Sequence, residues 1–193
     1  QYFGAKDREN LSLAIGNSIP QTAIASVIIM ILGTLISKPL LILLNTPPSI
    51  LDWSADYLRI FCLGGAGFAY YNILSGILRG LGDSLSALVF LLICTVLNVW
   101  LDIVFVANFN MGVPGVALAT VISQVISAVL CLLKLLRMKE IFHLNWSALK
   151  LNKYHSLTLI KLGLPSGLTH AIFSMAMIVV QSLTNRFGEL VIA

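Results

Sequence analysis

The sequence predicts an all-α, polytopic membrane protein. Hydrophobic residues make up 58% of the 193 positions and charged residues only 10%, whereas soluble domains carry about 25% charged residues. The mean hydropathy is +0.94, and apolar stretches of about 20 residues, the length that crosses a bilayer, recur along the chain. Continuous spans of this length form helices, because only helices and closed barrels satisfy every backbone polar group in lipid. The composition excludes an ordinary soluble domain.

Five stretches are long and apolar enough to cross a membrane. We expect the first to end before Pro39, since the residue preceding a proline avoids the helical region, and to kink at Pro20. Pro47 and Pro48 predict the start of the second helix, and Asp83 or Ser84 is expected to cap the third. The predicted spans cover residues 11–36, 51–78, 85–106, 113–136 and 157–183.

The basic residues predict how the chain is oriented. One set of loops holds most of the Lys and Arg residues, which places that side in the cytoplasm. We therefore expect residues 1–10, 79–84 and 137–156 to be cytoplasmic, and we attribute the net charge of +4 to membrane topology and not to nucleic-acid binding. The cytoplasmic set comprises Lys6, Arg8, Arg79, Lys134, Arg137, Lys139, Lys150, Lys153 and Lys161, against Lys38, Arg59 and Arg186 on the other side.

The longest polar stretch, residues 137–156, is interpreted as a linker between two bundles of helices. The chain begins with Gln1 and not with Met, and its last residues are apolar. We therefore expect sequence, and with it partner helices, to be missing at both ends. The cysteines lie inside apolar stretches without metal-ligand spacing, which predicts packing roles for them.

Asp102 is the most informative residue, because ionisable side chains inside a membrane are costly and usually mark an ion or substrate path. Asn98 lies one helical turn before it and Thr95 two turns before it, so the three share a face. A carboxylate beside an amide oxygen and a hydroxyl can bind a proton or a hard cation such as Na⁺. The alternative is an acid near the interface that is paired with a basic side chain or hydrated from outside.

A polar stripe follows the fourth span at helical spacing: Thr120, Ser123, Gln124 and Ser127. In lipid such a stripe must face protein or water. It either lines a cavity beside Asp102 or holds helices together by hydrogen bonds, and the pattern alone leaves both open.

Other features are weaker. Pairs of small residues four apart, such as Gly76 with Gly80 and Gly115 with Ala119, would allow close helix approach. Further polar residues within spans include Tyr57, Asn72 and Gln181. No catalytic arrangement is visible in the sequence, so an enzyme is not predicted.

Several segments together resemble the MATE family, the multidrug and toxic compound extrusion transporters. They are QYFGAKD (1–7), LLNTPPSI (43–50) with YLRI (57–60), ILRGLGDS (77–84), LNVWLDIVFV (97–106), GVPGVALATVISQ (112–124), LGLPSG (162–167) and NRFGELVIA (185–193). The resemblance implies a parent protein of twelve helices in two lobes, of which this chain holds helices three to seven. Residues 1–136 would then be N-lobe helices, 137–156 the interlobe linker and 157–193 the first helix of the C-lobe.

The resemblance also implies a cation site. Asn98 and Asp102 match an asparagine and an aspartate on the family's fifth helix, and Thr120 matches a threonine on the sixth. Tyr57 and Asn72 match positions on the fourth helix less closely. With Gln124 and Gln181 they are candidates to line the cavity or contact substrate. A further acid expected on the first helix lies outside this chain.

The implied function is secondary antiport: export of organic cations, drugs or other xenobiotics in exchange for H⁺ or Na⁺, with no other cofactor. We expect a multi-pass protein of a prokaryotic plasma (inner) membrane that contacts lipid and is monomeric at full length. A flippase for lipids or lipid-linked oligosaccharides is the alternative within the same superfamily. Such proteins usually line their cavity with basic residues, and here no Lys or Arg lies deep in a span. A non-transporting structural membrane protein is a third hypothesis, which would have no use for an Asn–Asp–Thr cluster.

Overall fold

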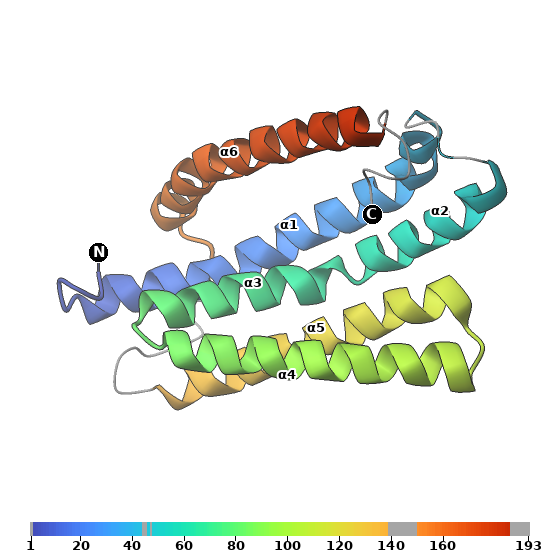
Figure 1. Ribbon diagram of the computed structural model, residues 1–193. Coiled ribbons are helices and arrows are strands. Elements are labelled where there is room, and N and C mark those ends of the chain that lie inside the picture. Colours follow the sequence, from blue (N-terminus) through green and yellow to red (C-terminus); the bar gives the residue numbers. More distant parts are fainter. Residues whose placement is uncertain (1, 44–45, 47, 139–149, 186–193) are drawn as a thin grey trace. The chain divides into compact units, whose positions relative to one another are not determined.

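The computed structural model describes residues 2–43, 46, 48–138 and 150–185. Helices account for nearly all of these residues, as predicted (Figure 1). The chain divides into two compact units, Gln1–Leu151 and Asn152–Ala193. The boundary falls inside the stretch predicted to be a linker, most of which lies outside the described residues. Whether the two units belong to separate lobes stays a prediction.

The first helix, α1 (Arg8–Leu43), is longer than predicted. Asp7 precedes it and accepts hydrogen bonds from the backbone nitrogen of Asn10 at 3.1 Å and from its side chain at 2.8 Å. The prediction that the helix ends before Pro39 was wrong, since both Pro20 and Pro39 lie inside it. An interior proline removes one backbone hydrogen bond and crowds the preceding turn, but it does not force an apolar helix in lipid to stop.

The second predicted span is one apolar stretch but two helices, α2 (Pro48–Leu63) and α3 (Gly65–Gly80). Their axes differ by 49°, and Gly64 lies between them. The predicted start of the helix is confirmed, because α2 begins at Pro48. The prediction of a single continuous helix over 51–78 was wrong.

The third and fourth spans agree closely with the prediction. Helix α4 (Ser84–Ile103) is capped by Asp83, which accepts a hydrogen bond from the backbone nitrogen of Ser86 at 3.0 Å. It continues into the π-helix η1 (Val104–Asn108) and turns back into α5 (Gly112–Arg137). Positive φ angles at Asn110 and Gly112 form this tight turn.

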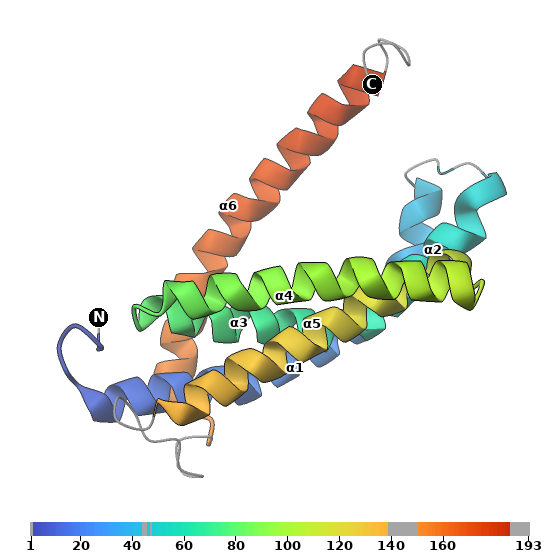
Figure 2. The ribbon, with the colours of Figure 1, turned by 60° about the horizontal axis from the view of Figure 1, so that its bottom comes forward.

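Helix α5 is the central helix of the first unit and packs against α2, α3 and α4. Figure 2 shows α4 and α5 close together near the turn that joins them and diverging toward the opposite end of the unit. The buried residues of α5 are mostly small, which lets neighbouring backbones approach closely. They are Gly115, Ala117, Ala119, Ser123, Ser127, Ala128, Cys131 and Leu135.

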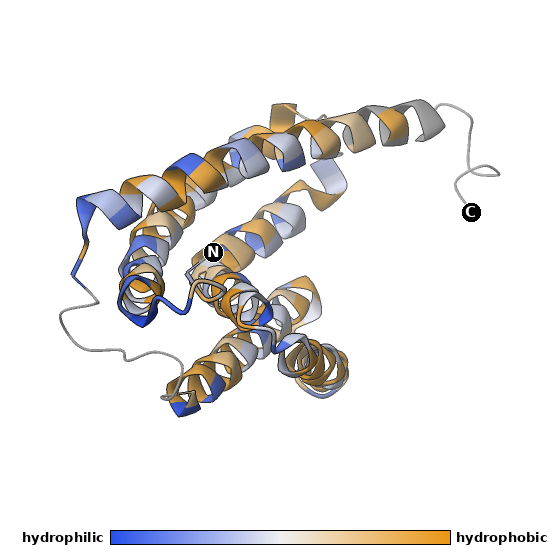
Figure 3. Cartoon of the chain, turned by 90° about the vertical axis from the view of Figure 1, so that its left-hand side faces the viewer, coloured by the Kyte–Doolittle hydropathy of each residue, from blue (hydrophilic) through white to orange (hydrophobic). Residues whose placement is uncertain are grey.

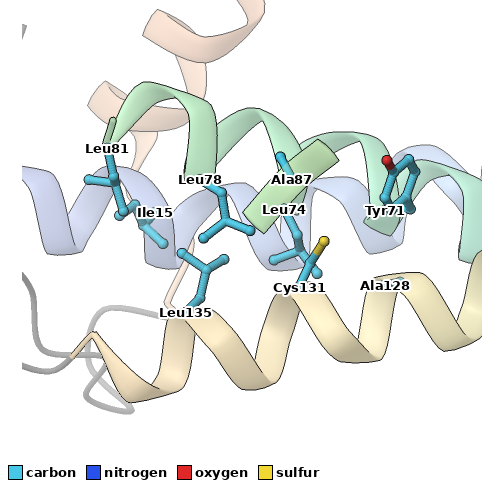
Figure 4. Packing of buried hydrophobic residues seen from close by; sticks show 9 residues of the cluster. All are labelled: Ile15, Tyr71, Leu74, Leu78, Leu81, Ala87, Ala128, Cys131 and Leu135. Atoms are coloured by element: carbon cyan, nitrogen blue, oxygen red, sulfur yellow. The ribbon is translucent and has the colours of Figure 1, made fainter. Parts of the chain in front are cut away.

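The hydrophobic core surrounds α3, where it packs against α1, α4 and α5, toward the end of the unit at which α4 begins (Figure 4). Leu78 and Cys131 are completely buried there, and Leu135 is 2% exposed. The remaining members are Ile15, Tyr71, Leu74, Leu81, Ala87 and Ala128. In lipid this packing stabilises the unit by close contact, because apolar side chains gain little from leaving lipid tails.

Hydrophobic residues recur along the helices (Figure 3), and many of their large side chains are exposed. Leu35, Leu85 and Val96 are each at least 70% exposed, as expected for side chains that face lipid. Within the described residues, α1, α4 with η1, and α5 are each long and apolar enough to cross a membrane. The bent pair α2 and α3 passes the same test when it is taken as one span. Helix α6 (Lys153–Asn185) runs through Pro165 and covers the fifth predicted span. That it crosses a membrane stays a prediction.

Candidate cation site between helices α4 and α5

The candidate site is built on two antiparallel helices joined by a side-chain hydrogen bond. Asn98 on α4 donates from Nδ2 to Oγ1 of Thr120 on α5 at 3.3 Å. Thr120 in turn donates to the carbonyl oxygen of Val116 at 3.0 Å. Because Asn98 uses its amide nitrogen in this bond, its amide oxygen is left to act as an acceptor. The structure therefore brings together two of the three residues predicted for the site.

Asp102 lies one turn from Asn98, toward the end of α4. Its Oδ1 atom is buried and has no hydrogen-bond partner. The described ion pairs join Lys38 to Asp52, Arg59 to Asp56 and Lys134 to Asp83, and none includes Asp102. Burying a carboxylate oxygen without a partner is energetically costly. The described residues supply no hydrogen bond or ion pair that would offset this cost at Oδ1 of Asp102.

The π-helix places Asp102 deeper than the sequence indicated. The predicted span ended at Val106, but η1 continues to Asn108. Asp102 therefore lies six residues, or about 9 Å at helical rise, from the end of the helix. π-Helical turns are rare and are frequent at functional sites, and η1 begins two residues after Asp102.

The polar stripe of α5 joins helices at two of its four positions. Thr120 accepts from Asn98, and Ser127 donates from Oγ to the carbonyl oxygen of Phe90 on α4 at 3.3 Å. Ser123 bonds within its own helix, to the carbonyl oxygen of Thr120 at 2.9 Å. Gln124 differs, because its Oε1 is buried without a hydrogen-bond partner. The stripe thus contains both interhelical bonds and an unsatisfied acceptor.

Glycines at the α2–α3 break hold α5 close. A Cβ on Gly64 would lie 2.1 Å from Cγ2 of Val121, and a Cβ on Gly67 would lie 2.6 Å from Cγ2 of Val125. Val121 directly follows Thr120, and Val125 directly follows Gln124. The position of the stripe therefore depends on two residues that have no side chain.

Gly64 and Gly67 were not predicted from the sequence to be contact residues. The available signal was their run with Gly65, three glycines in four positions inside an apolar span. Among the predicted pairs of small residues, a Cβ on Gly115 would lie close to Met111 and Phe105, whereas a Cβ on Gly76 or Gly80 would meet nothing within 4 Å.

The other predicted site residues make local contacts. Tyr57 stacks on Phe61 in the next turn of α2, with ring centroids 6.3 Å apart. Asn72 is exposed and donates to the carbonyl oxygen of Phe68 at 2.8 Å. Thr95 is also exposed and donates to the carbonyl oxygen of Leu91 at 3.0 Å. The side chain of Gln181 lies outside the described residues.

The oxygen atoms of the site suit a hard cation better than a transition metal. Carboxylate, amide and hydroxyl oxygens are ligands for hard ions, whereas zinc and copper favour imidazole and thiolate. Among the described residues there is no group of three or more His, Cys, Asp or Glu side chains that could hold a metal ion. The arrangement can accept a proton at Asp102 or coordinate a small monovalent cation there.

Comparisons with known proteins agree with this architecture. The chain is 28% identical over 196 residues to YoeA, a probable multidrug resistance protein of Bacillus subtilis, covering 98% of the chain and 42% of the relative. It is 34% identical over 162 residues to YpnP, a second such protein of that organism, covering 83% of the chain and 36% of the relative.

One solved structure has a closely similar fold. It is an inward-facing multidrug resistance transporter of the MATE family, with a TM-score of 0.85 at 24% identity, and the match covers 95% of this chain and 42% of that one. The chain thus spans about two fifths of the length of these proteins. The MatE family profile matches residues 1–104, which is more than half of the sequence. The chain therefore belongs to the MatE family, the multidrug and toxic compound extrusion transporters.

Proposed function

We propose that this chain forms part of a cation-coupled exporter of organic cations and other xenobiotics, and that Asp102, Asn98 and Thr120 bind the coupling ion. The observation that carries the proposal is the buried, unpartnered Oδ1 of Asp102 beside the Asn98–Thr120 link. In a bilayer an acid of this kind is a functional site by default. Family membership supports the same conclusion from independent evidence.

The proposed mechanism uses the carboxylate as the charge that changes. H⁺ or Na⁺ enters from outside and neutralises Asp102, which removes the cost of a bare charge between α4 and α5. Coupling requires that the ion and the substrate bind the two access states with different affinity. One charge moving inward supplies about 2.3 kcal/mol per 100 mV, which corresponds to roughly fortyfold accumulation of substrate.

The charged residues of the first unit support the proposed orientation. Lys134 and Arg137 lie in the last turn of α5, and Arg79 in the last turn of α3. Both ends belong to the side that we place in the cytoplasm of a bacterial inner membrane. Tyr57, Asn72 and Gln181 remain candidates for substrate contact in a complete, monomeric transporter. Because none of the described ion pairs includes Asp102, we favour a cationic substrate over the phosphate groups that a flippase would bind.

The test is coupled efflux by the full-length protein in inverted membrane vesicles, with a fluorescent organic cation as substrate. Asp102→Asn should abolish efflux driven by an ion gradient while insertion and yield stay unchanged. Asp52→Asn is the matched control, because that acid is an exposed member of the Lys38 ion pair. It should transport normally. Unchanged efflux in Asp102→Asn would refute the assignment, and separate H⁺ and Na⁺ gradients would identify the ion.

A further inference from the structure

The α4–α5 interface contains a second unsatisfied oxygen, on Gln124, that the proposed ion site does not use. The two interhelical bonds fix how the helices are aligned, since Asn98 meets Thr120 and Phe90 meets Ser127. Four residues before Asn98 is Cys94, and four residues after Thr120 is Gln124. These two residues therefore lie at the same level of the interface.

The interface can be described as four levels, about one helical turn or 6 Å apart. At the first level, nearest the turn between η1 and α5, Asp102 has an unpartnered oxygen. At the second level, the Asn98–Thr120 hydrogen bond joins the two helices. At the third level, Gln124 has an unpartnered oxygen. At the fourth level, the hydrogen bond from Ser127 to the carbonyl oxygen of Phe90 joins the two helices. Levels with an unpartnered oxygen therefore alternate with levels joined by a hydrogen bond. Because the levels of Asp102 and Gln124 are about two helical turns apart, one ion cannot contact both residues.

The Oε1 atom of Gln124 has no donor within hydrogen-bond distance. Cys94 at the same level is 4% exposed, and its thiol is only a weak donor. On the α3 side, the neighbouring Val125 packs on Gly67, which has no side chain. A buried amide oxygen without a donor is destabilising. Native structures retain such atoms where a ligand, ion or water meets them.

We infer that Gln124 provides a second, inner binding position for the coupling cation, and that this cation is a hard metal ion such as Na⁺. The inference rests on the proposed function, because the outer position is Asp102. An amide oxygen can ligate Na⁺ but does not take up a proton near neutral pH. A cation that leaves Asp102 toward the cytoplasm passes the Asn98–Thr120 bond and reaches Gln124 next. Two weak positions in series allow an ion to enter and still be released.

The first measurement is the Na⁺ concentration that gives half-maximal transport by the full-length protein in proteoliposomes. Gln124→Leu should raise it roughly tenfold, the effect of losing one charge-assisted ligand, while maximal transport is retained. Gln124→Glu keeps an oxygen at this position and should restore the wild-type value. Thr95→Val is the control: Thr95 is exposed on α4 and donates to the carbonyl oxygen of Leu91 in its own helix, so this variant should leave the value unchanged.

The second measurement uses the native thiol of Cys94 and does not require a variant of Gln124. In the full-length protein with every cysteine except Cys94 replaced by serine, Na⁺ should slow alkylation of Cys94 by a small maleimide, relative to choline at equal ionic strength. An unchanged Na⁺ requirement in Gln124→Leu together with no protection of Cys94 would overturn the inference. Transport that is driven by protons and indifferent to Na⁺ would overturn it too, yet it would leave the function proposed for Asp102 intact.

Discussion

We predict that adding a side chain at Gly64, in the break between α2 and α3, destabilises the protein, because it would clash with Val121 of α5. Gly64 has φ −82° and ψ 0°, a backbone conformation that other residues can adopt, so glycine is required here by space and not by its dihedral angles. In Gly64→Ala the new Cβ would lie 2.1 Å from Cγ2 of Val121 and 2.8 Å from its Cβ. The first distance is about 1.4 Å less than the 3.5 Å at which two carbons make favourable contact.

A change of side-chain rotamer cannot relieve this clash. The Cβ of Val121 is fixed by the backbone of α5, so α5 itself must move away from the break. We expect the free energy of unfolding to fall by about 1–3 kcal/mol, the usual cost of overpacking. Because Thr120 precedes Val121, the same movement should disturb the 3.3 Å Asn98–Thr120 bond and lower coupled efflux.

The assay is unfolding of the purified full-length protein in mixed micelles with increasing denaturing detergent, with efflux measured in parallel. Gly65→Ala is the control, since a Cβ there would meet nothing within 4 Å and alanine favours helix by about 0.5–1 kcal/mol. Val121→Ala in the Gly64→Ala background should recover part of the lost stability. If Gly64→Ala is as stable and active as Gly65→Ala, the steric argument fails.

Further predictions concern α3 and the turn into α4, and the same unfolding assay checks them. Gly67→Ala should destabilise, because its Cβ would lie 3.2 Å from a backbone nitrogen, whereas Gly76→Ala, with open space around it, should not. Asp83→Ala loses both the helix cap and the 3.2 Å ion pair with Lys134, at a cost of about 1–2 kcal/mol. Asp83→Asn keeps a capping oxygen and should lose at most about 1 kcal/mol. Hydrogen bonds from Ser86 first, and then Lys134, lower the pKa of Asp83 from its ordinary value of 3.8. The stabilisation by this carboxylate should therefore be complete above that value and disappear as the pH falls through the lower pKa of the folded protein. The difference in stability between wild type and Asp83→Asn should then shrink in acid, and a difference that is constant down to pH 2 would contradict the assignment.

The accuracy of the predicted spans follows from what defines each end. The third and fourth spans end where apolar sequence meets a glycine- or aspartate-containing turn, and there the predicted and observed bounds agree within two residues. The first span has no such end, because apolar residues continue past Pro39. The break at Gly64 has no change in hydropathy at all. It depends on contact with α5, which a one-dimensional hydropathy pattern does not contain.

The candidate site was predictable in part for similar reasons. Helical spacing places Asn98 and Asp102 on one side of α4, and the resemblance to the family added Thr120. The alignment of α4 with α5 decides which residues of the polar stripe meet α4, and periodicity within one helix cannot provide it. Thr95 illustrates this limit, because the buried face of α4 is carried by Cys94 and Leu101 while Thr95 is exposed. The prediction that the chain is not an enzyme agrees with its family.

Helix α5 links the fold to the proposed chemistry, because different faces of it make different kinds of contact. Its polar side chains form hydrogen bonds with α4 at two levels, and its valines pack on the glycines of the α2–α3 break. Any ion that pulls Thr120 or Gln124 toward itself must therefore also shift Val121 and Val125 against Gly64 and Gly67. These contacts have no flexible side chain on the α3 side to absorb a displacement, and closely packed elements transmit strain. The break is consequently the element of the described residues that should respond first to occupancy of the site, and a change in its 49° bend on ion binding is the structural difference to measure.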